Sequence, residues 1–186
     1  MLQSGQRGLP FKAIFGKGIP EVTPTHTLIS PLHPLGGEGW GRGKARWVIG
    51  GKLSIAYNCL DRHAMDPHAS NRLAFIWETE DGTIAKWIYL DLYKAANQCA
   101  NGLKSLGVRK GAAVGFYMPM IPELIVAFWA CMKLGAPLIP IFSGFGAKPL
   151  AVRLADAKAK VLLTADVGFY KARPIFLKAT CDEAAK

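Results

Sequence analysis

The segment Gly144-Phe-Gly-Ala-Lys148 is the part of the sequence that most nearly resembles a phosphate-binding loop. It has no third glycine, which a dinucleotide-binding fingerprint requires. It also lacks the Lys-Ser or Lys-Thr ending of a nucleotide-triphosphate loop. We therefore reject both motifs. Two interpretations of the glycines stay open: a turn that leads into the next helix, or a site for another anionic ligand.

Histidines and cysteines are the other candidates for metal or redox chemistry. His63 and His68 have Pro67 between them, so they do not share the helix face that a zinc site requires, and we interpret them as ordinary polar residues. The cysteines are too widely spaced for a CxxC pair and too few for a disulfide scaffold. They lie at positions 59, 99, 131 and 181. They favour a reduced, cytoplasmic setting, and we assign no metal ligand and no catalytic residue.

The charge balance is strongly basic. The 186 residues include 23 Lys plus Arg against 13 Asp plus Glu, a formal charge of +10. This balance predicts a polyanionic partner only if the charges cluster. They occur singly or in pairs such as Arg109-Lys110, so a solvated surface is the favoured interpretation and nucleic acid is not an expected partner. With 51% hydrophobic residues the chain can bury a sizeable core, which excludes a wholly disordered protein.

Residues 1–46 differ in composition from the rest. They contain five of the twelve prolines and nine of the twenty glycines, with no sustained period of two or 3.6. We predict a disordered or non-homologous extension, because ordering so much glycine costs entropy; an arm that docks on the domain is the alternative. Residues 47–186 form the predicted domain. Glycines, a proline and a lysine interrupt the first fifteen residues, which predicts no signal peptide.

The apolar stretch 111–132 is long enough to cross a bilayer. Pro119, Pro122 and Glu123 lie in its middle, where they would break a membrane helix and place a charge in lipid. We predict a buried strand, a turn and a buried helix instead, and no membrane partner.

Regular patterns begin at Trp47. A hairpin is predicted from residues 73–79 and 83–89, around Glu80-Asp81-Gly82. An apolar stripe with steps of four and three predicts a helix that ends near Gly107. The stripe consists of Leu92, Ala96, Cys99, Leu103 and Leu106. Further strands are predicted at 113–118, 136–142 and 160–164. Further helices are predicted at 122–134, stopped by Gly135, at about 148–157, and from about Pro174.

The alternation of strand and helix predicts an α/β fold with a Rossmann-like, mostly parallel sheet and helices on both faces. A parallel neighbour needs a crossover connection, and the crossover is usually a helix. Ligands of such sheets bind at the carboxyl ends of the strands. We therefore expect binding residues in the loops 117–121, 142–147 and 165–173.

Several segments resemble the amino-terminal region of acetyl-CoA synthetases, which are AMP-forming acyl-CoA synthetases of the adenylate-forming enzyme family. The most specific are YNCLDRH at 57–63 and YMPMIPE at 117–123. Two others are ANGLKSLGV at 100–108 and DAKAKVLLTAD at 156–166. The resemblance extends from about Trp47 to the end of the sequence. Residues 1–46 do not share it.

The resemblance implies two half-reactions. A short carboxylate attacks ATP to give acyl-AMP and pyrophosphate, and the thiol of coenzyme A (CoA) then displaces AMP. Both steps develop negative charge, so backbone amides, cations and Mg²⁺ must be held in place. In the family a phosphate loop and a lysine of a mobile carboxyl-terminal domain meet these needs, and neither occurs in this sequence. We therefore expect a truncated, partial domain that does not catalyse ligation alone, with ATP and Mg²⁺ bound only in a complete enzyme.

The resemblance also implies part of a CoA site. In the family, a Gly-rich turn after a strand and arginines of a later loop hold the nucleotide part of CoA. The turn corresponds to 142–146 and the loop to 167–173. Gly144 would let a phosphate approach the backbone, and Arg173 would pair with it. The candidate residues are Ser143, Gly144, Tyr170 and Arg173.

This sequence departs from the family pattern at two of those positions. Ser143 stands where a glycine is usual, and Tyr170 stands where the first arginine is usual. We expect CoA binding to be weak or lost as a result.

Two alternatives to a truncated ligase stay open. One is a basic, non-catalytic α/β module that binds nucleotide or nucleic acid through Arg42, Lys44 and Arg46. The other is a subunit that is completed by a separately encoded remainder of the enzyme. The family relationship implies a carboxylic acid substrate such as acetate, propionate or a longer acid. The sequence does not select among these acids, because the acyl pocket lies outside this region.

Overall fold

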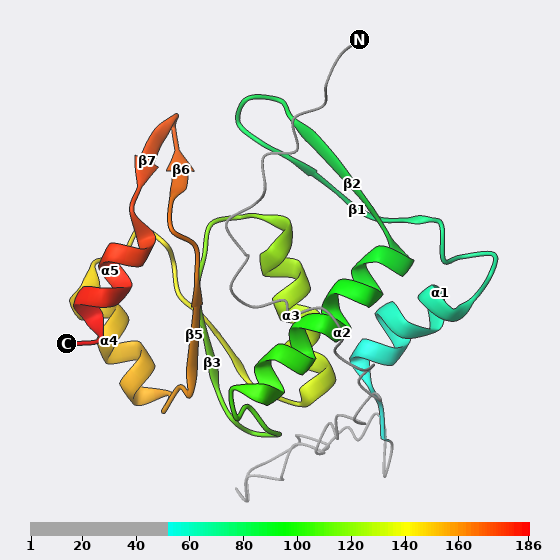
Figure 1. Ribbon diagram of the computed structural model, residues 1–186, viewed down its shortest axis with the longest axis horizontal. Helices are drawn as coiled ribbons and strands as arrows, with labels where there is room; N and C mark the ends of the chain where they lie inside the picture. Colours follow the sequence, from blue (N-terminus) through cyan, green and yellow to red (C-terminus); the bar gives the residue numbers. More distant parts are fainter. Residues whose placement is uncertain (1–51) are drawn as a thin grey trace, which may run out of the picture.

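The computed structural model describes residues 52–186 (Figure 1). The predicted boundary between residues 46 and 47 lies outside this range, as do Arg42, Lys44 and Arg46. The first half of the described chain contains the π-helical turn η1 (Tyr57–Asp61), α1 (Arg62–Met65), β1 (Leu73–Glu78), β2 (Ile84–Ile88), α2 (Tyr89–Ser105) and β3 (Val114–Tyr117). The second half contains α3 (Pro122–Leu134), β4 (Leu138–Pro140), α4 (Ala147–Asp156), β5 (Val161–Thr164), β6 (Gly168–Tyr170), β7 (Arg173–Ile175) and α5 (Leu177–Ala184).

The central sheet is parallel and has the strand order β4-β3-β5. The chain passes from β3 through α3 to β4 on one side of β3. It then returns through α4 to β5 on the other side of β3. The direction of winding therefore reverses at β3, which is a topological switch point of an open α/β sheet.

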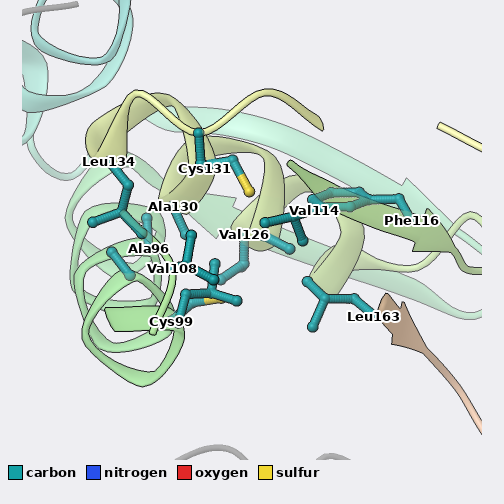
Figure 2. Packing of buried hydrophobic residues seen from close by; sticks show 14 of the residues in the cluster. Ala96, Cys99, Val108, Val114, Phe116, Val126, Ala130, Cys131, Leu134 and Leu163 are labelled. Atoms are coloured by element: carbon teal, nitrogen blue, oxygen red, sulfur yellow. The ribbon is translucent and has the colours of Figure 1, made fainter. Parts of the chain in front are cut away.

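The two faces of the sheet have separate cores, because successive residues of a strand point to opposite faces. Val114, Phe116 and Leu163 pack with α2 and α3 in the main core (Figure 2). Tyr117 and Leu162 pack on the other face, in a smaller core that includes residues of α4 and α5. Figure 1 shows the two helix pairs on opposite sides of β3 and β5. The predicted α/β class, with helices on both faces, is confirmed.

Helices α2 and α3 follow the sequence pattern closely. Pro122 begins α3, where its missing N–H costs nothing, and Gly135 ends it with φ 63°, a left-handed conformation that favours glycine. The predicted stripe of α2 is buried except at Leu106, whose prediction was wrong: 58% of this residue is exposed. The helix ends at Ser105, so Leu106 no longer lies on its inner face.

The hairpin predicted around Gly82 is present as β1 and β2, which pair in antiparallel fashion. The stretch 111–132 forms β3, a turn and α3, as predicted. No helix among residues 52–186 has the length and apolar character that crossing a membrane requires.

The carboxyl-terminal part differs from the sequence prediction. The helix expected from about Pro174 begins only at Leu177, and Pro174 lies in β7 opposite Phe169 of β6. Residues 168–175 thus form a second antiparallel hairpin that the sequence pattern did not indicate. Its strands have three residues each, and proline is tolerated in such a two-stranded edge where its missing N–H faces solvent.

A buried ion pair joins three helical segments. Lys133 of α3 donates a hydrogen bond to Asp61 of η1, and both side chains are fully buried. The Lys133 ammonium also lies 4.5 Å from the centre of the Tyr93 ring of α2. Buried charges are costly unless they are paired, so Asp61 and Lys133 each require the other. The pair therefore fixes η1 against α2 and α3.

Removing one member of this pair is expected to destabilise the domain strongly. Asp61→Leu or Lys133→Met alone leaves an uncompensated buried charge and lowers the free energy of unfolding by about 3–5 kcal/mol. The double variant leaves no charge and loses less than either single variant. Urea unfolding measures all three.

The exposed Lys178–Asp182 pair of α5, with side chains 54% and 61% accessible, provides the control. Lys178→Met is expected to change stability little, because solvent screens an exposed pair. Additive effects of Asp61→Leu and Lys133→Met would contradict the coupling.

Candidate functional site

The candidate site lies at the carboxyl edge of the parallel sheet. The strands β3, β4 and β5 end there at Tyr117, Pro140 and Thr164. The loops that follow them are the three in which the sequence predicted binding residues. Because the winding reverses at β3, this edge opens between loops that lead to opposite faces of the sheet.

The turn after β4 contains two of the predicted residues. Ser143 and Gly144 occupy its centre, and the Phe145 N–H closes it by donating to the Phe142 carbonyl oxygen at 3.0 Å. The Tyr117 hydroxyl lies 2.9 Å from the Ser143 carbonyl oxygen and 2.6 Å from that of Phe145. Burial raises the pKa of Tyr117, so its hydroxyl stays protonated and donates to one of these carbonyls at a time. The Tyr117 hydroxyl thus links the turn after β4 to β3.

A side chain at Gly144 would displace the exposed ring of Phe142. A Cβ atom at this position would lie 2.5 Å from Cε1 of the Phe142 ring, which is closer than any normal contact. The absence of a side chain lets the ring lie across the turn. Approach of a phosphate to the Gly144 backbone remains a prediction.

Helix α4 follows the turn and adds positive potential. No side chain caps its amino terminus at Gly146, and its first turn carries Lys148. The Arg153 guanidinium lies 4.4 Å from the centre of the Phe145 ring, so a cation on α4 packs against the turn. Helix amino termini favour anions because their first N–H groups have no partner within the helix.

Tyr170 and Arg173, the other two predicted residues, flank the turn of the β6–β7 hairpin. They face each other as cross-strand partners, and both are exposed. The Arg173 side chain makes no hydrogen bond or ion pair with another residue in the range 52–186, so its guanidinium is available to a ligand. Lys171 and Ala172 form the turn with φ 51° and 57°. Two positive φ values are typical of a type I′ turn, which prefers Asn and Gly and costs about 1 kcal/mol or more per ordinary residue.

Glu80, which the sequence analysis named only as part of the predicted hairpin turn, holds the Lys171-Ala172 turn. Its carboxylate accepts hydrogen bonds from the Lys171 N–H at 3.0 Å and the Ala172 N–H at 2.8 Å. These two backbone bonds lower the pKa of Glu80. Glu80 lies at the tip of the β1–β2 hairpin, and Figure 1 shows that tip directed toward the β6–β7 turn. No local sequence signal could have revealed a partner 91 residues away.

The structure therefore brings the four predicted residues together as two pairs. Ser143 and Gly144 share one turn, and Tyr170 and Arg173 flank another. Both turns belong to connections that leave the carboxyl edge of the same sheet. No hydrogen bond or ion pair within residues 52–186 joins one pair to the other, so a ligand that contacts both would have to bridge them.

The described residues contain no group of three or more His, Cys, Asp or Glu that could hold a metal ion. His63 packs against Tyr89, with the two ring centres 4.9 Å apart. All four cysteines are free, and burial raises the pKa of Cys99 and Cys131 to about 12, which makes these thiols unreactive.

Comparison with known proteins agrees with this architecture. The family model described as AMP-binding enzyme matches residues 61–185. The chain belongs to the AMP-binding enzyme family. The matched range includes the parallel sheet, both hairpins and all four candidate residues.

Among curated relatives of this AMP-binding family member are several CoA synthetases. It is 48% identical over 139 residues to the acetyl-coenzyme A synthetase of Laribacter hongkongensis, covering 75% of this chain and 21% of that protein. It is 47% identical over 142 residues to the enzyme of the same name from Methanothrix soehngenii, with the same coverage. It is also 45% identical over 139 residues to the 3-hydroxypropionyl-coenzyme A synthetase of Sulfurisphaera tokodaii, again with 75% and 21% covered. The chain thus spans about a fifth of the length of these relatives.

In this AMP-binding family member, the bonds from Glu80 to the turn are expected to depend on pH. The folded pKa of Glu80 is lowered from the ordinary value of 4.5, so the carboxylate holds the turn at neutral pH. The contribution of the Glu80 carboxylate to the stability of the turn is present above the unfolded pKa of Glu80. It disappears as the pH falls through the lower, folded pKa. NMR shifts of the Lys171 and Ala172 amides are expected to titrate with a midpoint below 4.5.

Neighbouring Asp81 gives an internal comparison for that titration. Hydrogen bonds, chiefly from the Thr79 hydroxyl, lower its pKa to about 2. Glu80→Gln is therefore expected to remove the Glu80 step and to leave the Asp81 step in place. A midpoint at or above 4.5 for the two turn amides would show that Glu80 does not hold the turn in solution.

Proposed function

We propose that this chain contributes the CoA-binding edge of an AMP-forming acyl-CoA synthetase. The observation that carries the proposal is the position of Arg173, exposed and without an ion-pair partner among the described residues, on a connection that leaves the same sheet edge as the turn 142–146. Family membership supports it, because the family model spans both segments and the relatives include proteins named as acetyl-CoA and 3-hydroxypropionyl-CoA synthetases. We propose that the ligand at this edge is the nucleotide end of CoA.

The residues suit the chemistry of that ligand. Phosphate groups are best recognised by arginine, whose planar guanidinium donates parallel hydrogen bonds to two oxygens. We assign this role to Arg173, with Lys148 and the amino terminus of α4 adding positive potential. The exposed ring of Tyr170, directly opposite Arg173, offers an aromatic surface against which adenine can stack. Ser143 and Gly144 present backbone groups from a turn that Tyr117 holds.

In the complete enzyme we propose that a short carboxylate is activated with ATP to acyl-AMP, and that the thiol of CoA displaces AMP. ATP and Mg²⁺ supply the adenylation chemistry there. We assign no residue of the described part to ATP or Mg²⁺. The remainder of the enzyme is the proposed partner of this segment. The free cysteines suit a reducing compartment, and we propose the cytoplasm.

Because Ser143 and Tyr170 depart from the family pattern, we propose that the chain binds CoA weakly, and not that binding is lost. The test is a calorimetric titration of the chain at low salt, carried to millimolar CoA. Arg173→Ala is expected to weaken binding about tenfold or more, because a hydrogen bond to a charged group contributes about 1.5–3 kcal/mol. Adenosine 3′,5′-bisphosphate, the nucleotide end of CoA, is expected to bind with the same dependence on Arg173.

The control variant is Lys104→Ala. Lys104 is an exposed cation in the last turn of α2, which leads into the amino end of β3, opposite the proposed site. We expect it to leave CoA affinity unchanged. Equal affinity of wild type and Arg173→Ala would overturn the assignment. Retention on heparin that requires Arg42, Lys44 and Arg46 and is insensitive to CoA would favour a polyanion-binding module instead.

A further inference from the structure

We propose that Glu80 is a positioning residue for the CoA site: by holding the Lys171-Ala172 turn, it keeps Arg173 and Tyr170 in the geometry that receives the ligand. This inference rests on the proposed function above. It assigns a specific task to a carboxylate that lies outside the three predicted binding loops. The two hydrogen bonds that this carboxylate accepts come from residues 91 and 92 positions later in the sequence.

The β6–β7 hairpin has little to hold it in place by itself. It contains only three residue pairs, and isolated two-stranded hairpins are marginally stable in water. Its turn consists of two ordinary residues in the left-handed region, a conformation for which Asn-Gly is the favoured sequence. Two bonds from one carboxylate to consecutive N–H groups select this conformation. Loss of these bonds would let the flanking residues depart from it.

The β1–β2 hairpin, which carries Glu80, is itself anchored. The Trp77 indole N–H of β1 donates a hydrogen bond of 2.7 Å to the Met120 carbonyl oxygen, in the loop after β3. The β1–β2 hairpin therefore contacts two of the three carboxyl-edge loops, one through Trp77 and the other through Glu80. Through these two contacts, the hairpin holds the turn beside Arg173 in a fixed position relative to β3, the central strand of the sheet.

The direction in which CoA affinity changes when Glu80 is replaced distinguishes a positioning role from an electrostatic one. A carboxylate near a phosphate-binding site repels the ligand, so its removal would raise affinity if charge alone mattered. If Glu80 acts by positioning, its removal lowers affinity, because only the fraction of molecules with a competent hairpin binds CoA. The two accounts predict opposite changes for Glu80→Gln, which preserves size and removes the charge.

The first experiment measures CoA affinity of the full chain by calorimetry for wild type, Glu80→Gln and Glu78→Gln. Glu78 is an exposed residue of β1 that loses the same charge without a bond to the β6–β7 turn. We expect Glu80→Gln to weaken binding about fivefold or more and Glu78→Gln to leave it unchanged. Unchanged or increased affinity for Glu80→Gln would overturn the inference.

The second experiment tests whether Glu80 acts through the turn. The double substitution Lys171→Asn with Ala172→Gly installs the sequence that adopts a type I′ turn unaided. In that background, adding Glu80→Gln is expected to have no effect on CoA affinity. A full additional loss there would mean that Glu80 acts by another route, and the inference would be wrong.

The two proposals fail in different ways. Wild-type chain that does not bind CoA overturns the proposed function and this inference together. Binding that requires Arg173 but not Glu80 leaves the proposed function intact and overturns only the role of Glu80.

Discussion

The buried pair of Asp61 and Lys133 is the constraint from which the rest of the arrangement follows. Two opposite charges without access to water can persist only in contact, so η1 and α3 must meet at this point. The Tyr93 ring beside Lys133 brings α2 to the same place. Three segments that are distant in sequence are thereby fixed relative to one another on one face of the sheet.

That constraint is transmitted to the site through short connections. Helix α2 starts directly after β2, so the β1–β2 hairpin extends from a fixed helix. Helix α3 starts directly after the loop that contains Met120, to which Trp77 of the same hairpin is bound. The hairpin thus has two attachments to the main core, and its tip presents Glu80 to the β6–β7 turn. A continuous set of contacts leads from a buried ion pair to the residues proposed to bind CoA.

The smaller core, on the other face of the sheet, holds the turn after β4. Tyr117 packs with Leu150 and Leu177 on the face covered by α4 and α5, and its hydroxyl reaches the turn after β4. The Ser143–Gly144 turn is therefore held from beneath by the central strand, whereas the Tyr170–Arg173 pair is held from the side by the β1–β2 hairpin. A ligand that contacts both turns would connect the turn held by β3 with the turn held by the β1–β2 hairpin, across the switch point of the sheet.

Elements whose signals are local could be predicted from the sequence. Pro122 and Gly135 bound α3, and the stripe from Leu92 to Leu103 marks the buried face of α2, because both signals lie within the helices themselves. The loops at the carboxyl edge followed from the strand–helix alternation.

Features that depend on distant partners could not be predicted. The β6–β7 turn contains neither glycine nor asparagine, and its conformation depends on Glu80, 91 residues earlier. The Asp61–Lys133 pair spans 72 residues and has no periodic signature. The four candidate residues came from family resemblance, and the geometry explains only how their backbones are held.

The most direct test of the central claim is a CoA titration of the isotopically labelled chain, followed by amide NMR shifts. The account predicts the largest shifts in two places, residues 142–146 and 168–173, with the amides of α2 around Leu103 unchanged. Shifts in only one of the two turns, in α2, or nowhere at millimolar CoA would contradict a ligand that bridges the two turns at the carboxyl edge.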